Sequence, residues 1–236
     1  AASPRLTAGL YRAEAARVRE LEQAAARRAA VSIVSSTQAA ERIASFAPGL
    51  PVVVVRNGVD PERYPTRPNR ATEPVIAFIG SLESAHGLRA ATEFCRVVLP
   101  AVRAQVAGAR VLIPGRDLSS SARRLARLPG VEIVDSCGDV RALLRCAAVA
   151  VSPSGDSNGA LQGALEAMAA GVPLVASRKS LNGLGAKFDR EVYVKDDPGA
   201  LAHRLVELLS SESMRAEVGG RGRAFVRAYH SWDAAA

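Results

Sequence analysis

Residues 149–177 read VAVSPSGDSNGALQGALEAMAAGVPLVAS, and this stretch decides the fold. A run rich in β-branched residues stops at Ser152, a loop of small and polar residues follows, and a helix is predicted over about 160–170 because the loop offers several N-caps. Gly171 ends that helix, and a second strand follows at once. The stretch therefore predicts a strand, a helix and a second strand, with the start of the helix facing the loop.

Glu166 is the one carboxylate on a helix otherwise built of apolar and small side chains. A buried carboxylate needs a partner. If Leu165 and Met168 face the sheet, Glu166 faces the crevice beyond the strands, where a carboxylate can accept two hydrogen bonds from the ribose hydroxyls of a nucleotide. The structural alternative is an ion pair with Arg178 or Lys179, which follow the next strand.

Strands and helices alternate through the last two thirds of the chain. The six strand candidates are 75–79, 110–113, 131–134, 148–151, 173–176 and 191–194. This pattern predicts an α/β fold, a doubly wound, mostly parallel, Rossmann-like sheet with right-handed crossovers. The expected strand order is 3-2-1-4-5-6, which places a ligand beyond the carboxyl ends of the first and fourth strands. The loops 80–87 and 152–159 would meet there.

Two backbone features of these loops suit a phosphate. The amides of Gly159, Ala160 and Leu161 open a helix, and a helix N-terminus carries unpaired donors and partial positive charge. The loop 80–87, GSLESAHG, could close over the same phosphates, with His86 as a titratable donor. It matches neither GxGxxG nor GxxxxGK[ST], so taken alone it is equally a plain turn.

The first part of the chain predicts a smaller α/β region. Its expected elements are a helix at 5–30, a strand at 31–35, a helix at 38–46 and a buried strand at 51–55. Tyr11, Ala15 and Val18 form an apolar stripe on the first helix. Residues 59–74 contain four prolines among polar and charged residues, which favours extended backbone and a linker.

Charge and composition narrow the classes of partner. The chain has 236 residues, 48% of them apolar, and a net charge of +8. Residues 1–70 hold 11 Lys and Arg against 6 Asp and Glu, mostly on the first predicted helix. Such a helix suits an anionic membrane surface or a phosphate-bearing ligand, or is simply a solvated arginine face. Nucleic acid is not expected, because aromatics make up only 4% and none lies among the basic residues.

Metal and membrane signals are also weak. The three cysteines and three histidines lack the spacing of a disulfide framework or a metal site. Cys95 and Cys146 lie in predicted helices with apolar neighbours, so we expect both to pack in the core. The absence of a long apolar run or a leader predicts a soluble, cytoplasmic chain, with a peripheral contact at the inner face of the membrane left open.

Four segments carry a family resemblance: 53–60 (VVVRNGVD), 79–87 (IGSLESAHG), 149–177 and 197–232. Together they resemble the donor-binding half of the retaining, nucleotide-sugar-dependent glycosyltransferases with two Rossmann-like domains, the GT-B architecture, family 4 type. GALEAMAAGVPLVAS also resembles the bacterial exopolysaccharide-associated sugar transferases. The resemblance runs from about residue 5. It implies three regions: the end of an N-terminal acceptor domain at 1–58, a Pro-rich linker at 59–74 and a donor-binding domain at 75–236.

The resemblance also implies roles for single residues. Glu166 would hold the ribose, the amides of 159–161 the distal phosphate or sugar, and backbone near Cys137 the base. The family has a Glu, an Arg and a Lys where this chain has Asn158, Ser81 and His86. The expected catalytic residues are Asn158, His86 and Glu166, and the expected binding residues are Gly80, Ser81, Cys137, Gly159, Ala160, Leu161, Glu166, Arg178 and Lys179.

These departures bear on the chemistry, because a diphosphate leaving group needs fixed cations or amide donors. Ser81 carries no charge, His86 could act if protonated, and Arg178 or Lys179 could substitute. The resemblance implies a retaining hexosyltransferase that moves a sugar from a UDP- or GDP-type donor to a glycan or lipid-linked acceptor, without cofactor or metal. Most of the acceptor site would be missing, so the chain alone would be inactive.

Two other functions remain open at this point. The altered residues also fit a catalytically degenerate donor-binding or scaffold domain of the same fold. A sugar-nucleotide epimerase of similar two-domain architecture is a third hypothesis, but the sequence around Glu166 and the C-terminal segment fit it poorly.

Overall fold

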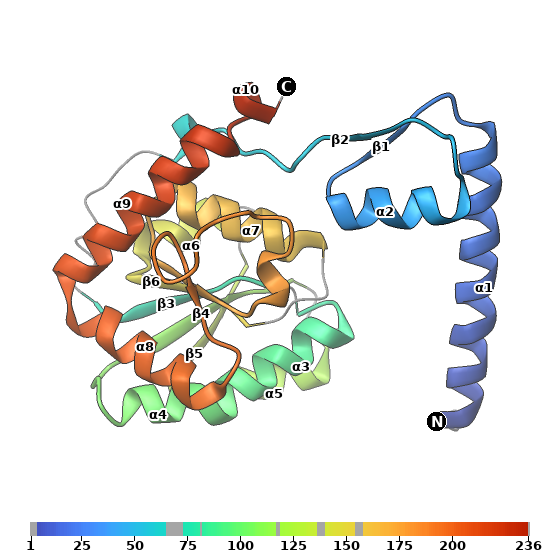
Figure 1. Ribbon diagram of the computed structural model, residues 1–236. Coiled ribbons are helices and arrows are strands. Elements are labelled where there is room, and N and C mark those ends of the chain that lie inside the picture. The colour runs from blue at the N-terminus through green and yellow to red at the C-terminus, as the bar shows by residue number, and fades with distance from the viewer. Residues whose placement is uncertain are drawn as a thin grey trace. The chain divides into compact units, whose positions relative to one another are not determined.

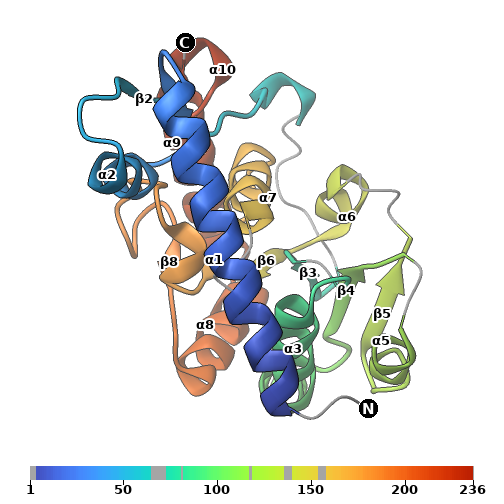
Figure 2. The same ribbon diagram turned by 90° about the vertical axis from the view of Figure 1, so that its right-hand side faces the viewer.

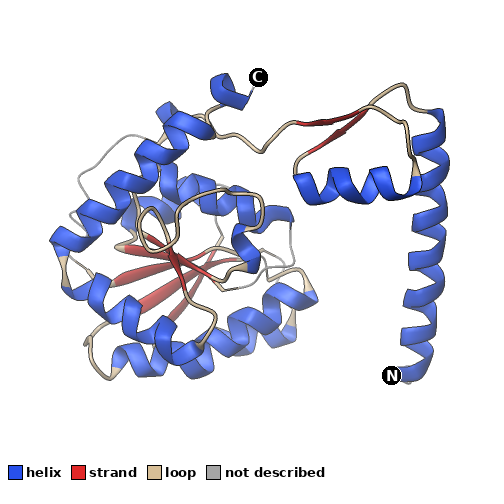
Figure 3. Cartoon of the chain, viewed as in Figure 1, coloured by secondary structure: helices blue, strands red, loops and turns tan. Residues whose placement is uncertain are grey.

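The computed structural model describes residues 4–64, 73–80, 82–116, 119–135, 140–153 and 158–235. The chain forms two compact units that divide between Arg56 and Asn57, and each is described by itself. Figure 3 shows helices surrounding the strands of the second unit. Within the described ranges, no helix combines the length and the hydropathy that crossing a bilayer requires.

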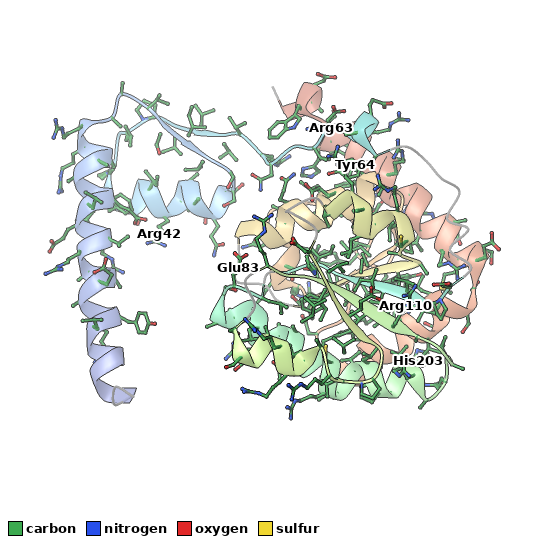
Figure 4. The ribbon with its side chains drawn as sticks, turned by 180° about the vertical axis from the view of Figure 1, so that it is seen from behind. Arg42, Arg63, Tyr64, Glu83, Arg110 and His203 are labelled. Carbon is green, nitrogen blue, oxygen red and sulfur yellow. The ribbon has the colours of Figure 1, made fainter. Side chains whose placement is uncertain are left out.

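The first unit is a single βαβ motif preceded by a long helix. Its elements are α1 (Pro4–Arg28), β1 (Ser32–Val34), α2 (Thr37–Phe46) and β2 (Val52–Val54). β1 and β2 pair in parallel, with α2 as the crossover. The N-terminus of α2 is capped by Ser36, whose hydroxyl accepts a hydrogen bond from the Ala39 amide at 3.2 Å. Arg42 of α2 pairs with Glu22 of α1 at 3.1 Å (Figure 4).

Apolar side chains of this unit lie at the surface, which corrects one expectation. The strand expected at 51–55 is not buried, since Val53 is 48% exposed and Val54 is 38% exposed. The stripe on α1 is exposed as well, with Tyr11 75% and Val18 44% accessible. The reason is that the described part of this unit has only two strands and two helices, too few to cover both faces of a parallel sheet.

The second unit contains a six-stranded sheet (Figure 1). Its strands are β3 (Val75–Phe78), β4 (Arg110–Pro114), β5 (Val131–Val134), β6 (Val149–Ser152), β7 (Leu174–Ala176) and β8 (Tyr193–Val194). All neighbours pair in parallel, in the order β5-β4-β3-β6-β7-β8. In chain order of the six strands this is 3-2-1-4-5-6, so the predicted α/β fold and topology are confirmed.

Helices cover both faces of this sheet. They are α3 (Ala85–Glu93), a π-helical turn η2 (Phe94–Val98), α4 (Leu99–Arg103), α5 (Ser120–Leu125), α6 (Val140–Cys146), α7 (Asn158–Ala169), α8 (Pro198–Ser210), α9 (Glu212–Tyr229) and α10 (Trp232–Ala235), with 3₁₀ turns η1 (Pro61–Arg63) and η3 (Lys179–Leu181). Strand alternation sorts the core. Val149 and Val151 of β6 pack with α3, α4 and α8, whereas Ala150 packs with α6 and α7. Figure 2 shows the two layers on opposite sides of the sheet.

Part of the expected linker is built into the second unit. Val59 is 4% exposed, and its amide donates to the His230 carbonyl at 2.8 Å. Tyr64 is 8% exposed, beside the helical layer that contains α9 (Figure 4). The structure has the turn η1 here instead of extended backbone. The buried guanidinium of Arg223 donates to the carbonyl of its first residue, Pro61, and to the carbonyl of Tyr64, which follows the turn. Residues 65–72 of the expected linker lie outside the described residues.

The two described cysteines differ in burial, which corrects the expectation that both pack in the core. Cys95 in η2 is 3% exposed, and burial raises the pKa of its thiol to about 12. Cys146 is exposed because it ends α6 on the side away from the buried Leu143 and Leu144. Cys137 lies outside the described residues.

This difference predicts selective alkylation. Because only a thiolate reacts rapidly, iodoacetamide at pH 8 should modify Cys146 in the native protein and Cys95 only after unfolding. Peptide mass spectrometry with and without urea measures both sites, and Cys146→Ser identifies the signal of the exposed thiol. Equal native rates at the two cysteines would contradict the buried position of Cys95.

Candidate functional site

The strand order reverses between β3 and β6, and the two loops that leave these strands start side by side. Phe78 and Val151 are register partners, and the Ile79 amide donates to the Val151 carbonyl at 2.8 Å. Both strands end at the same edge because they are parallel. The reversal of strand order is therefore confirmed at the place where the sequence predicts it. Ser81 and residues 154–157 of the two loops lie outside the described residues.

Helix α7 begins at this edge and is held close to the sheet. Its backbone is helical from Asn158, so the amides of Gly159, Ala160 and Leu161 lie in its first turn. A Cβ atom on Gly163 would lie 2.4 Å from Cγ2 of Ile79, so only glycine allows this approach. The side chains of the first three helical residues lie outside the described residues, and Leu161 is partly buried.

Glu166 takes the position on α7 that the sequence pattern predicts. Leu165 and Met168 are 0% and 1% exposed and pack on the sheet, whereas Glu166 is only partly buried. Gln162, one turn earlier on the same face, places its side-chain amide 3.5 Å from the Gly58 carbonyl. Glu166 thus borders the packed face of α7 rather than lying within it.

The loop after β3 is held in place by contacts among its own residues. Gly80 allows a close approach, because a Cβ there would lie 2.8 Å from the Phe78 ring. Ser84 caps α3, its hydroxyl accepting from the Gly87 amide at 2.9 Å. Glu83, exposed in the same loop, adds a negative charge here (Figure 4).

His86 lies on the first turn of α3, next to a permanent cation. Its Nδ1 lies 3.3 Å from Nη2 of Arg89, one turn later on the same helix. A guanidinium can only donate, so Nδ1 is the acceptor in this contact. Sequence analysis did not single out Arg89; the only signal for it was the three-residue spacing from His86.

Arg178 and Lys179 both lie at the surface beyond the carboxyl end of β7. The Arg178 amide donates to Oδ1 of Asp196 at 2.9 Å, and its guanidinium lies over the Phe188 ring at 5.1 Å from the ring centroid. Stacking on a ring leaves the edge N–H groups able to bind an anion. Lys179 begins η3, which packs against α7, so the fold brings these cations near the helix that carries Glu166.

Three buried serines lie at the carboxyl ends of β6 and β7, and sequence analysis did not single them out. Ser152, Ser177 and Ser180 are 0%, 9% and 1% exposed. The Ser180 hydroxyl donates to the Ser152 carbonyl at 2.8 Å and lies 2.8 Å from the Ser177 hydroxyl. The Ser177 amide donates to the same carbonyl at 2.9 Å. Strand-end serines were visible in the sequence, but their convergence was not.

Across the described ranges, no three His, Cys, Asp or Glu side chains come together as a cluster that could hold a metal ion. The backbone near Cys137, expected to contact a base, lies outside the described residues.

Comparisons with known proteins complete the description of the site. A family profile described as "Glycosyl transferases group 1" matches residues 73–211, which is more than half of the chain. That range contains the whole sheet of the second unit, α7 and Glu166. A search of curated proteins returns no match.

Solved structures with the same fold include the following three proteins. TarM superposes with a TM-score of 0.77 at 16% identity, over 93% of this chain and 44% of TarM. Sucrose-phosphate synthase from Thermosynechococcus elongatus superposes with a TM-score of 0.68 at 23% identity, over 92% of this chain and 58% of the synthase. Anabaena Alr3699/HepE in complex with UDP-glucose superposes with a TM-score of 0.70 at 17% identity, over 90% of this chain and 63% of HepE. At these identities the likeness shows the fold, and the chain spans about half the length of these proteins.

Proposed function

The chain belongs to the glycosyl transferases group 1 family, and we propose that its second unit binds the nucleotide-sugar donor of a retaining sugar transfer. The observation that carries the proposal is the start of α7 at the β3–β6 reversal point, with the carboxylate of Glu166 two turns along the same helix. Amide donors for a phosphate and a carboxylate for a ribose are thus presented by one rigid element.

Each group in this site has a proposed role. The amides of Gly159, Ala160 and Leu161 hold the distal phosphate or the sugar, and Glu166 accepts hydrogen bonds from the ribose. Asn158 contacts a sugar hydroxyl, and backbone around Gly80, Ser81 and Cys137 lines the rest of the site. We propose no metal and no cofactor, since the donor itself carries the activated group.

Charge on the leaving diphosphate must be stabilised as the sugar–phosphate bond breaks. Arg89, on the helix that follows β3, and Arg178, which follows β7, are the candidate cations. Lys179 is a third. His86 contributes a hydrogen-bond donor through its Nε2–H, because Nδ1 accepts from Arg89.

The proposed acceptor site involves residues outside the second unit. The exposed valines of β2 and the exposed stripe of α1 are typical of surfaces that further protein covers. We propose that residues 1–58 are the end of an acceptor-binding domain for a glycan or lipid-linked acceptor, as in bacterial exopolysaccharide synthesis. The arginines of α1 suit a peripheral contact with the inner, cytoplasmic face of an anionic membrane.

A second function is favoured by one observation, the loss of charge at the altered positions. Asn158 and Ser81 are uncharged, whereas the glycosyltransferases that this chain resembles have a Glu and an Arg there. A degenerate donor-binding domain would bind a nucleoside diphosphate without transferring sugar. A longer chain with a complete N-terminal domain that binds UDP but neither transfers nor hydrolyses UDP-sugars would favour this function.

The Glu166→Gln variant tests the proposed donor site. Replacing the carboxylate with an amide removes a charged acceptor of two ribose hydrogen bonds. We therefore expect the dissociation constant for UDP or GDP to rise about tenfold. Isothermal titration calorimetry measures the dissociation constants. Glu217→Gln is the matched control, because Glu217 is an exposed carboxylate on α9 paired with Arg221. Equal binding by the wild-type protein and Glu166→Gln, or none by either, would refute the site.

A further inference from the structure

Ser152 carries a buried hydroxyl without a hydrogen-bond partner among the residues that the structure describes. The residue is 0% exposed, and its Oγ has no hydrogen-bond partner within the described parts of the chain. Buried side-chain hydroxyls are nearly always paired, since an unpaired one costs about 1–3 kcal/mol. A polar group kept in this state is a candidate for bonding to a ligand.

Ser152 faces the side of the sheet that α7 covers. Successive side chains of a strand alternate between faces, and Ala150 of β6 packs in the cluster that contains α7. Ser152, two residues later, therefore faces the same side. It is also the last residue of β6, at the edge where α7 begins with Asn158. The unpaired hydroxyl thus lies at the same edge and on the same face of the sheet as the start of α7.

The other two serines hold the backbone of Ser152 and leave its side chain free for this purpose. Ser180 Oγ and the Ser177 amide both donate to the Ser152 carbonyl, at 2.8 Å and 2.9 Å. The carbonyl is therefore saturated while the hydroxyl is not. The hydroxyl is shielded from bulk water. Its partner is therefore a group that the protein itself holds in place, and a helix N-terminus holds an anion in this way.

We propose that Ser152 Oγ donates a hydrogen bond to the distal phosphate of the nucleoside diphosphate at the N-terminus of α7. The inference rests on the proposed donor site and adds to it a residue that distinguishes a diphosphate from a monophosphate. A hydroxyl donor suits this place because it contributes no charge, and the amides and Arg178 already supply positive potential.

The test compares the stability and the nucleotide affinity of Ser152→Ala. Removing an unpaired hydroxyl costs no hydrogen bond, so the melting temperature of the free protein should be unchanged or higher. The affinity for UDP should fall about tenfold, and the affinity for UMP, which lacks the distal phosphate, should not change. Ser180→Ala is the matched control, since it removes a bonded buried hydroxyl and should lower the melting temperature.

The outcomes separate the two proposals. If the wild-type protein binds neither UDP nor GDP, the proposed function fails. If the wild-type protein binds UDP and Ser152→Ala binds it equally well, only the role of Ser152 is overturned. A lower melting temperature of free Ser152→Ala would show a structural partner for the hydroxyl, and equal losses for UDP and UMP would exclude the distal phosphate; either result overturns the inference.

Discussion

Gly219→Ala should lower the free energy of unfolding by about 3 kcal/mol or more, because the added methyl would overlap the backbone of another segment. Gly219 lies on α9 where that helix crosses the end of α7, and a Cβ there would lie 2.0 Å from the Gly171 carbonyl oxygen and 2.9 Å from its carbon. Gly171 cannot move aside easily. It has a φ of +72° and ends α7 through hydrogen bonds from its own amide to Met168 and from the Val172 amide to Ala167.

The neighbouring glycine is the control for this prediction. Gly220 is exposed on the same helix, and a Cβ there would meet nothing within 4 Å. Gly220→Ala should therefore stabilise α9 by up to about 1 kcal/mol, the difference in helix propensity between the two residues. Urea denaturation followed by circular dichroism measures both variants. Shifts of the same sign and size would show that α9 does not contact Gly171 as described.

Arg223→Met should also cost about 3 kcal/mol, because it leaves several buried carbonyls without a donor. Arg223 is 8% exposed, and its guanidinium donates to the carbonyls of Ala169, Tyr64 and Pro61. It joins the end of α7, α9 and the turn η1. Burial lowers the pKa of the guanidinium, nearby Arg227 lowers it further and Glu62 opposes the shift, yet an arginine stays charged at neutral pH.

Arg223→Met should also have a local effect, in addition to lowering the free energy of unfolding. Without Arg223, the segment around η1 should open, and the Val59 amide should exchange its hydrogen faster while the sheet amides stay protected. Hydrogen exchange with mass spectrometry measures this. Arg221→Met is the matched control, because Arg221 only pairs with Glu217 on the surface of α9 and should cost less than about 0.5 kcal/mol. Unchanged exchange at Val59 would contradict the bridging role.

The sequence was most informative where the pattern of neighbouring residues was enough to predict a helix or strand. The βαβ stretch 149–177 contains its own strand periodicity, helix start and glycine stop, so β6, α7, β7 and the position of Glu166 follow from neighbouring residues. The alternation of strands and helices likewise determined the parallel sheet and its order. Burial was less predictable: the valines of β2 have the same pattern as a core strand but lie exposed, because burial depends on what packs against them.

Tertiary structure alone decided the contacts between distant residues. Ser152 and Ser180 are 28 residues apart, and the Arg223 guanidinium reaches back 162 residues to the Pro61 carbonyl. No local pattern marks such pairs, because a side chain and a backbone carbonyl impose no periodicity on each other. The sequence by itself thus determined the fold and the helix that carries the candidate site, since these follow from short-range periodicity, whereas packing across the sheet decided which polar groups are bonded, buried or left unpaired.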